Sequence, residues 1–121
     1  QCIAALVEDL HERGTDREIM LVVMGEFGRT PRLSKNSNGV GRDHWPQAYS
    51  VLLAGGGLKT GQVIGATNSK AEHPVARPLK PDDVLATIYA VLGIDPQTSF
   101  KDFAGRPVSL VDHGQAIREI F

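Results

Sequence analysis

The chain has 121 residues, of which 41% are hydrophobic and 22% are charged, and its formal net charge at pH 7 is -1. This is enough chain for one small domain with one hydrophobic core, and the balanced charge gives no reason to expect a nucleic acid partner. No apolar run approaches the roughly 20 residues of a membrane-spanning helix, and the single cysteine, Cys2, excludes an internal disulfide.

The N-terminal segment predicts a helix followed by a buried strand. A helix is expected over residues 1–13, ended by Gly14, because apolar residues recur with the helical period at Ile3, Leu6, Val7 and Leu10. Residues 17–24 predict a strand whose apolar run does not alternate, as in a strand covered on both faces of a parallel sheet. We therefore expect an α/β fold with a mainly parallel sheet flanked by helices.

A long connection and a second strand follow. Residues 25–47 are rich in glycine, proline and arginine, and connections of this length are usually functional or disordered. Residues 49–54 predict a second buried strand, which the three glycines at 55–57 end. A short strand is possible at 62–64, and residues 66–80 are expected to be irregular.

The C-terminal third predicts a second helix and a mostly exposed tail. Pro81 is expected to open this helix, with two aspartates in its first turn, and Gly93 to end it. Its apolar stripe comprises Val84, Leu85, Ile88, Val91 and Leu92. In the tail, residues 105–107 predict a turn and residues 116–120 a turn of helix.

Charged side chains gather where the first strand ends, in the segment "GEFGRTPR", residues 25–32. The end of a strand in an α/β sheet is a common ligand site, where Glu26 could hold a cation or transfer a proton. Arg29 and Arg32 carry planar guanidinium groups that suit carboxylate, phosphate or sulfate. The alternatives are structural: Glu26 could cap the loop or pair with either arginine, and the arginines could pin the long loop.

A second cluster, "GRDHWP", occupies residues 41–46. Asp43 and His44 are adjacent, so in an extended chain their side chains point to opposite sides and at most one faces a site directly. The other would orient a neighbour or anchor the loop. Trp45 is expected to pack beneath the loop.

Three other histidines are expected to lie outside any site. "VDHG", residues 111–114, resembles a metal motif, but we interpret it as surface tail because only seven residues follow it. His73 is expected in an irregular loop and His11 on the solvated side of the first helix. The chain contains no phosphate-binding P-loop and no G-x-S-x-G nucleophile motif.

Taken together, five segments resemble the C-terminal part of the domain of unknown function 1501 family. They are "LVVMGEFGRTPR", "GRDHWP", "LLAGGGLKTGQVIGATN", "RPLKPDDVLATIYAVLGID" and "GRPVSLV". The family is bacterial, with many members in Planctomycetes, and resembles the alkaline phosphatase/sulfatase superfamily. The resemblance implies a partial alkaline phosphatase-like fold with three α/β/α layers. It also implies that residues 1–121 are a single domain at the C-terminal end of a longer polypeptide, which is exported or periplasmic.

The same resemblance implies a hydrolase of small-molecule or glycan sulfate or phosphate esters that uses a divalent metal, Zn, Ca, Mg or Mn. Glu26 takes the place of a metal-binding aspartate and His44 resembles a later metal-binding histidine. Arg29 would clamp the anionic ester and Asp43 would support the ligands. Phe27 stands where the superfamily has a further histidine, so one metal position loses a ligand.

The resemblance further implies that the remaining ligands and the nucleophile lie in the polypeptide upstream of Gln1, and that residues 1–121 alone are inactive. The alternative is a non-catalytic binding or structural module that keeps the superfamily fold.

Overall fold

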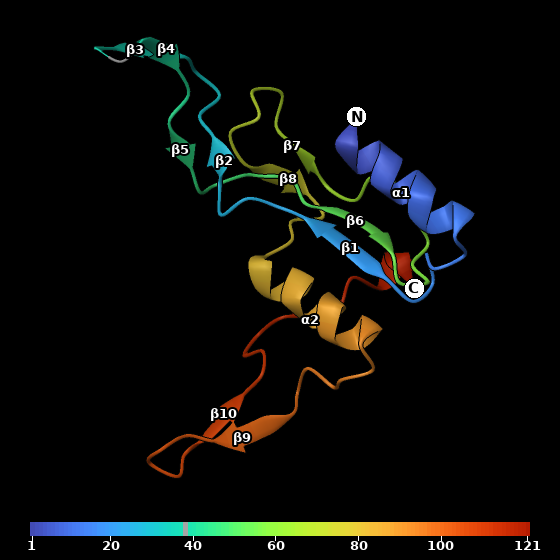
Figure 1. The fold of residues 1–121 in the computed structure, drawn as a ribbon. Helices are drawn as coiled ribbons and strands as arrows, with labels where there is room; N and C mark the ends of the chain where they lie inside the picture. The colour runs from blue at the N-terminus through green and yellow to red at the C-terminus, as the bar shows by residue number, and fades with distance from the viewer. Residues whose placement is uncertain (38) are drawn as a thin grey trace.

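A computed structural model describes residues 1–37 and 39–121 (Figure 1). Its helices are α1 (Cys2–Glu12), α2 (Pro81–Val91) and the single 3-10 turn η1 (Arg118–Ile120). The strands are β1 (Met20–Val23), β2 (Gly28–Arg29), β3 (Ser34–Asn36), β4 (Gly39–Gly41), β5 (His44–Trp45), β6 (Leu52–Gly55), β7 (Ala66–Thr67), β8 (Pro74–Ala76), β9 (Ser99–Lys101) and β10 (Pro107–Ser109).

Both predicted helices are confirmed, with ends that follow the local signals. Gly14 and Gly93, just beyond α1 and α2, have φ of 69° and 72°, a left-handed conformation that glycine adopts without a Cβ penalty. Pro81 is the first residue of α2, where its missing N–H costs no helical hydrogen bond. Within the described residues, neither helix is both long and apolar enough to cross a membrane.

Strands β1 and β6 pair antiparallel at the centre of the molecule, with Met20 opposite Gly55 and Val23 opposite Leu52. The two helices lie on either side of this pair (Figure 1). Helix α1 contacts β6, and the end of α2 approaches the start of β1 closely enough that a Cβ at Gly56 would meet both Met20 and Val91. This cover on both faces accounts for the non-alternating apolar sequence of β1.

The expected parallel sheet in a three-layer alkaline phosphatase-like arrangement is wrong. Throughout the described residues, every strand pair is antiparallel. A parallel neighbour requires a crossover that returns the chain to the starting edge of the sheet, usually through a helix. The described part of residues 24–51 contains no helix. It runs out through β2 and β3 and back through β4 and β5, so the chain re-enters the sheet at the edge where β1 ended.

Among the described residues, the remaining strands form four small antiparallel pairs, β2–β5, β3–β4, β7–β8 and β9–β10. The β3–β4 and β9–β10 pairs extend from opposite ends of the molecule (Figure 1). The predicted strand at 62–64 does not form, and residues 66–80, expected to be irregular, contain β7 and β8. Strands form within or beside the predicted ranges 17–24 and 49–54, as β1 and β6, but they are half-buried rather than buried, and Leu52 is exposed.

The small core lies between α2 and the C-terminal segment. Its buried residues come from the inner face of the helix and from the tail: Val84, Ala86, Thr87, Val111, Ile117 and Ile120. The interpretation of residues 111–114 as surface tail is therefore wrong for Val111 and Gly114, which are buried, while Asp112 and His113 are exposed. The core therefore depends on apolar residues of the tail, which bury the inner face of α2.

Candidate functional site

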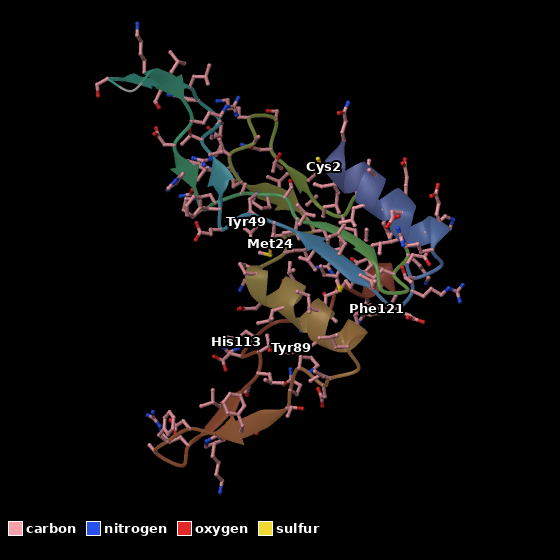
Figure 2. The ribbon with its side chains drawn as sticks, viewed as in Figure 1. Cys2, Met24, Tyr49, Tyr89, His113 and Phe121 are labelled. Carbon is pink, nitrogen blue, oxygen red and sulfur yellow. The ribbon has the colours of Figure 1, made fainter. Side chains whose placement is uncertain are left out.

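A hollow of about 430 Å³ opens where β1 ends. Four segments contribute to it: the residues just after β1, strand β2, the approach to β6 and the β7–β8 loop. Its lining residues are Gly25, Phe27, Gly28, Arg29, Ala48, Tyr49, Ser50, Thr67 and Ala71. Figure 2 shows Met24 and Tyr49, which precede and line this hollow, close together at the same end of the central pair.

Strand β2 contributes Gly28 and Arg29 to the wall of the hollow, and β5 pairs with β2 behind it. Arg29 lies opposite His44 and Gly28 opposite Trp45. Beyond this pair, the Thr30 N–H donates to the Asp43 carbonyl at 3.0 Å, and the Asp43 N–H donates to Thr30 Oγ1 at 3.1 Å. The two sequence clusters, residues 25–32 and 41–46, are therefore held against each other by their backbones.

Gly28 is required by the close approach of the chain at this wall. A Cβ at position 28 would collide with the backbone carbonyl of Ala48. Glycine lets the backbone leading into β6 pass directly against β2. The neighbouring residues Tyr49 and Ser50 are thereby brought to the hollow.

A hydrogen bond from Trp45 joins β5 to the β7–β8 loop at the rim of the hollow. The indole N–H of Trp45 donates to the Glu72 carbonyl at 2.6 Å. The loop that contains Glu72 is closed by Asn68, which bonds to both the side chain and the backbone N–H of Glu72. This contact ties the β7–β8 loop to β5 and places Thr67 and Ala71 at the rim. Trp45 is half-buried, as expected of a residue that packs under a loop.

Arg29 is the predicted site residue that lines the hollow. Its side chain is exposed, and Nη1 donates to the Arg42 carbonyl at a long 3.4 Å. Among the residues that the structure describes, no other partner occupies the guanidinium, so most of its donors can bind an oxyanion.

His44 lies across the β2–β5 pair from Arg29, and its ring packs on Phe27 with centroids 4.0 Å apart and an interplanar angle of 36°. Residues directly opposite on paired strands share a face. Phe27, Arg29 and His44 therefore form one small cluster beside the hollow.

Two of the predicted site residues, Glu26 and Asp43, do not line the hollow. Glu26 is exposed and lies between two lining residues, Gly25 and Phe27, without lining the hollow itself. Asp43 contributes its backbone to the clamp with Thr30, while its carboxylate is exposed. In the described part of the chain, no hydrogen bond or ion pair joins Glu26 to His44, and no three His, Cys, Asp or Glu side chains form a group that could hold a metal ion.

Sequence reasoning missed three hydroxyl groups at the hollow, those of Tyr49, Ser50 and Thr67. The expectation of a parallel sheet placed the start of the second strand at the edge opposite to the end of β1. An antiparallel pair puts these two points at the same edge, which brings Tyr49 and Ser50 to Arg29. No sequence signal marks Thr67.

Comparison with known proteins assigns the family. The chain belongs to the family described as "Protein of unknown function (DUF1501)", whose model matches residues 1–121. No curated protein and no solved structure matches the chain. The expected family is thus confirmed.

Proposed function

We propose that this member of the DUF1501 family binds the anionic group of a sulfate or phosphate ester in the hollow at the end of β1, with Arg29 as the main anion-binding residue. One observation carries the proposal: the lining residues include one fixed cation, Arg29, and three hydroxyl groups, but no carboxylate. A guanidinium with free donors beside neutral donors suits the tetrahedral oxygens of such an ester.

Hydrolysis of the bound ester is the finer proposal, and the resemblance to the alkaline phosphatase/sulfatase superfamily supports it. Glu26 and His44 lie on the two segments that β2 and β5 hold together, and either could bind a divalent cation. Two donors do not complete a metal centre, which takes four or more ligands. The described residues therefore do not fit a metal site on their own, and ester binding by Arg29 does not depend on one.

In the hydrolase proposal, Glu26 and His44 would help to hold Zn, Ca, Mg or Mn, which would act as a Lewis acid on the ester. The remaining metal ligands and the nucleophile would come from upstream polypeptide, as the resemblance implies. A non-catalytic binding module remains the second candidate, because the same hollow would hold a sulfated or phosphorylated glycan without cleaving it. Activity of the full-length protein on a panel of aryl sulfates and phosphates, with each metal in turn, separates the two candidates.

Ester binding is tested by calorimetric titration of the full-length protein with p-nitrophenyl sulfate and p-nitrophenyl phosphate. Arg29→Gln should weaken binding about tenfold or more, because a charge-assisted hydrogen bond contributes about 1.5–3 kcal/mol. Arg32→Gln is the matched control: Arg32 is exposed in the same segment but does not line the hollow. Equal affinities in the wild type and both variants would contradict the proposal.

Metal binding is tested separately, by measuring metal content in the wild type, Glu26→Ala and His44→Ala proteins. Each substitution should lower the bound metal. Stoichiometric binding that is equal in all three proteins would remove both residues from the metal site while leaving the role of Arg29 intact.

A further inference from the structure

A second hollow, of about 410 Å³, lies at the start of helix α2, apart from the residues that line the first one. It forms where residues 77–83 meet the C-terminal segment 113–119. Its charged and histidine lining residues are Arg77, Lys80, Asp83, His113, Arg118 and Glu119. Figure 2 shows His113 on the C-terminal segment alongside α2.

Both carboxylates of this hollow already have partners. Glu119 accepts two hydrogen bonds from the Arg77 guanidinium, at 2.6 and 3.0 Å, and this pairing lowers the pKa of Glu119 to about 2. Asp83 accepts from the Gln115 N–H at 2.9 Å and from the Lys80 N–H at 2.8 Å. The charge of Glu119 is therefore offset by Arg77, whereas Asp83 keeps its charge but has both carboxylate oxygens occupied by backbone donors.

The basic groups are not balanced in the same way. Lys80 and Arg118 are exposed, and neither forms an ion pair with any residue that the structure describes. His113 adds a ring nitrogen to the same hollow. The groups left to meet a ligand are thus two fixed cations and an imidazole.

The wall that carries His113 and Arg118 is firmly attached to α2. At Gly114 a Cβ would collide with the carbonyl of Asp82, so the segment passes directly over the start of the helix. Further along, the Ile117 N–H donates to the hydroxyl of the fully buried Thr87 at 2.9 Å. The hollow is therefore formed before a ligand arrives, which lowers the entropic cost of binding.

We propose that this hollow is a second oxyanion site, in which Lys80, Arg118 and His113 bind a phosphate or sulfate group. The ligand is either the free ion or such a group on a small molecule or glycan. The site is independent of Arg29 and of the ester-binding hollow.

The test is a two-dimensional NMR titration of the 15N-labelled full-length protein with inorganic phosphate and, separately, sulfate. Saturable shifts are expected for amides in residues 77–83 and 113–119. Lys80→Gln combined with Arg118→Gln should weaken this binding about tenfold or more, since two charged donors are lost. The charge-matched control is Lys101→Gln with Arg17→Gln, two exposed cations outside both hollows, which should bind like the wild type.

A third variant, Glu119→Gln, should raise the affinity for phosphate instead of lowering it. It removes a negative charge and releases Arg77, so phosphate should bind several-fold more tightly. Absence of saturable shifts in these two segments, or equal affinity in the double variant and its control, would overturn the proposal. So would unchanged or weaker binding by Glu119→Gln at unchanged thermal stability. The two hollows share no lining residue, so the NMR titration follows them through different backbone amides. A failure of ester binding at Arg29 can therefore be told apart from a failure of phosphate binding at the second hollow.

Discussion

The hydroxyl group of Thr87 joins helix α2 to the C-terminal segment. It donates to the Asp83 carbonyl at 2.6 Å within the helix and accepts from the backbone N–H of Ile117 at 2.9 Å. Thr87 is fully buried and Ile117 is 4% exposed, so no water can replace this partner for the Ile117 N–H. Thr87 thus provides a buried polar link between the two parts of the core, in addition to the bond from the Gln115 N–H to the Asp83 carboxylate.

Thr87→Val keeps the shape of the side chain but leaves the buried Ile117 N–H without an acceptor. We expect a loss of about 1–3 kcal/mol in the free energy of unfolding, the usual cost of an unsatisfied buried group. Thr87→Ser, which keeps the hydroxyl and loses only a methyl group, should cost about 1 kcal/mol. Urea denaturation measures both, and a valine variant as stable as the serine variant would contradict the role of the hydroxyl.

Gly114→Ala should destabilise the same junction for a steric reason. The added Cβ would run into the backbone carbonyl of Asp82, and backbone moves less readily than a side chain. We expect a loss of about 1–3 kcal/mol, as for other overpacked sites. Gly41→Ala is the control, because a Cβ at Gly41 meets nothing within 4 Å. Equal unfolding temperatures in the two variants would contradict this prediction, because they would show that the backbone at residue 114 can move away from the Asp82 carbonyl without loss of stability.

The Arg77–Glu119 pair predicts a pH dependence with a definite direction. The pKa of Glu119 falls from 4.5 to about 2 because its carboxylate accepts hydrogen bonds from Arg77. A group with a lowered folded-state pKa stabilises the fold above its unfolded pKa, so this contribution is present above pH 4.5 and is lost as the pH falls towards 2. Carboxylate NMR should give a Glu119 midpoint near 2 in the wild type.

Arg77→Gln removes the donor and should return the Glu119 midpoint towards 4.5. Asp102, whose pKa is lowered by its own hydrogen bonds from Arg106, serves as the internal reference and should not move. A Glu119 midpoint that is unchanged by the substitution would mean that Arg77 is not its partner in solution.

The contact between Phe27 and His44 should be visible in the spectrum of the histidine. Phe27→Leu removes the aromatic ring that lies 4.0 Å from the imidazole centroid. The His44 ring protons should lose their ring-current shift, and stability should fall by about 0.5–1.5 kcal/mol, the usual contribution of an aromatic pair. His73, in the loop between β7 and β8, should keep its shifts. Unchanged His44 resonances would show that the rings are apart in solution.

The same position offers a gain-of-function test of the proposed metal ligands. Phe27→His would place a second imidazole beside His44 and next to Glu26, giving three donors in one cluster. Zinc affinity should rise at least about tenfold over the wild type, because a third protein ligand approaches the number found in catalytic zinc sites. Phe27→Leu is the control, and equal zinc affinity in the two variants would place Glu26 and His44 too far apart to share an ion.

Of the four residues that the sequence analysis placed in a site, one lines the hollow after β1, and the roles of all four stay predictions. The charged segment after β1 does border a hollow, and Arg29 lines it. Glu26 and His44 remain predictions as metal ligands. The hydroxyl groups of Tyr49 and Ser50 were missed because their position depends on strand direction. His113 was set aside because only seven residues follow its segment, and the packing of Val111 and Gly114 against the core has no local signal.

Local sequence signals were enough to predict the two helices and the two central strands, because each depends mainly on residues close together in the chain. The apolar period predicts the helices, Pro81 opens α2, and glycines at positions 14 and 93 end the helices in left-handed conformations. The antiparallel direction of β1 and β6 and the entry of the tail into the core became clear from the folded chain alone. Both features depend on contacts between residues that are far apart in the sequence, which local patterns do not encode. The strand direction depends on the backbone pairing of β1 with β6, and the position of the tail depends in part on the bond from the Ile117 N–H to the buried Thr87 hydroxyl.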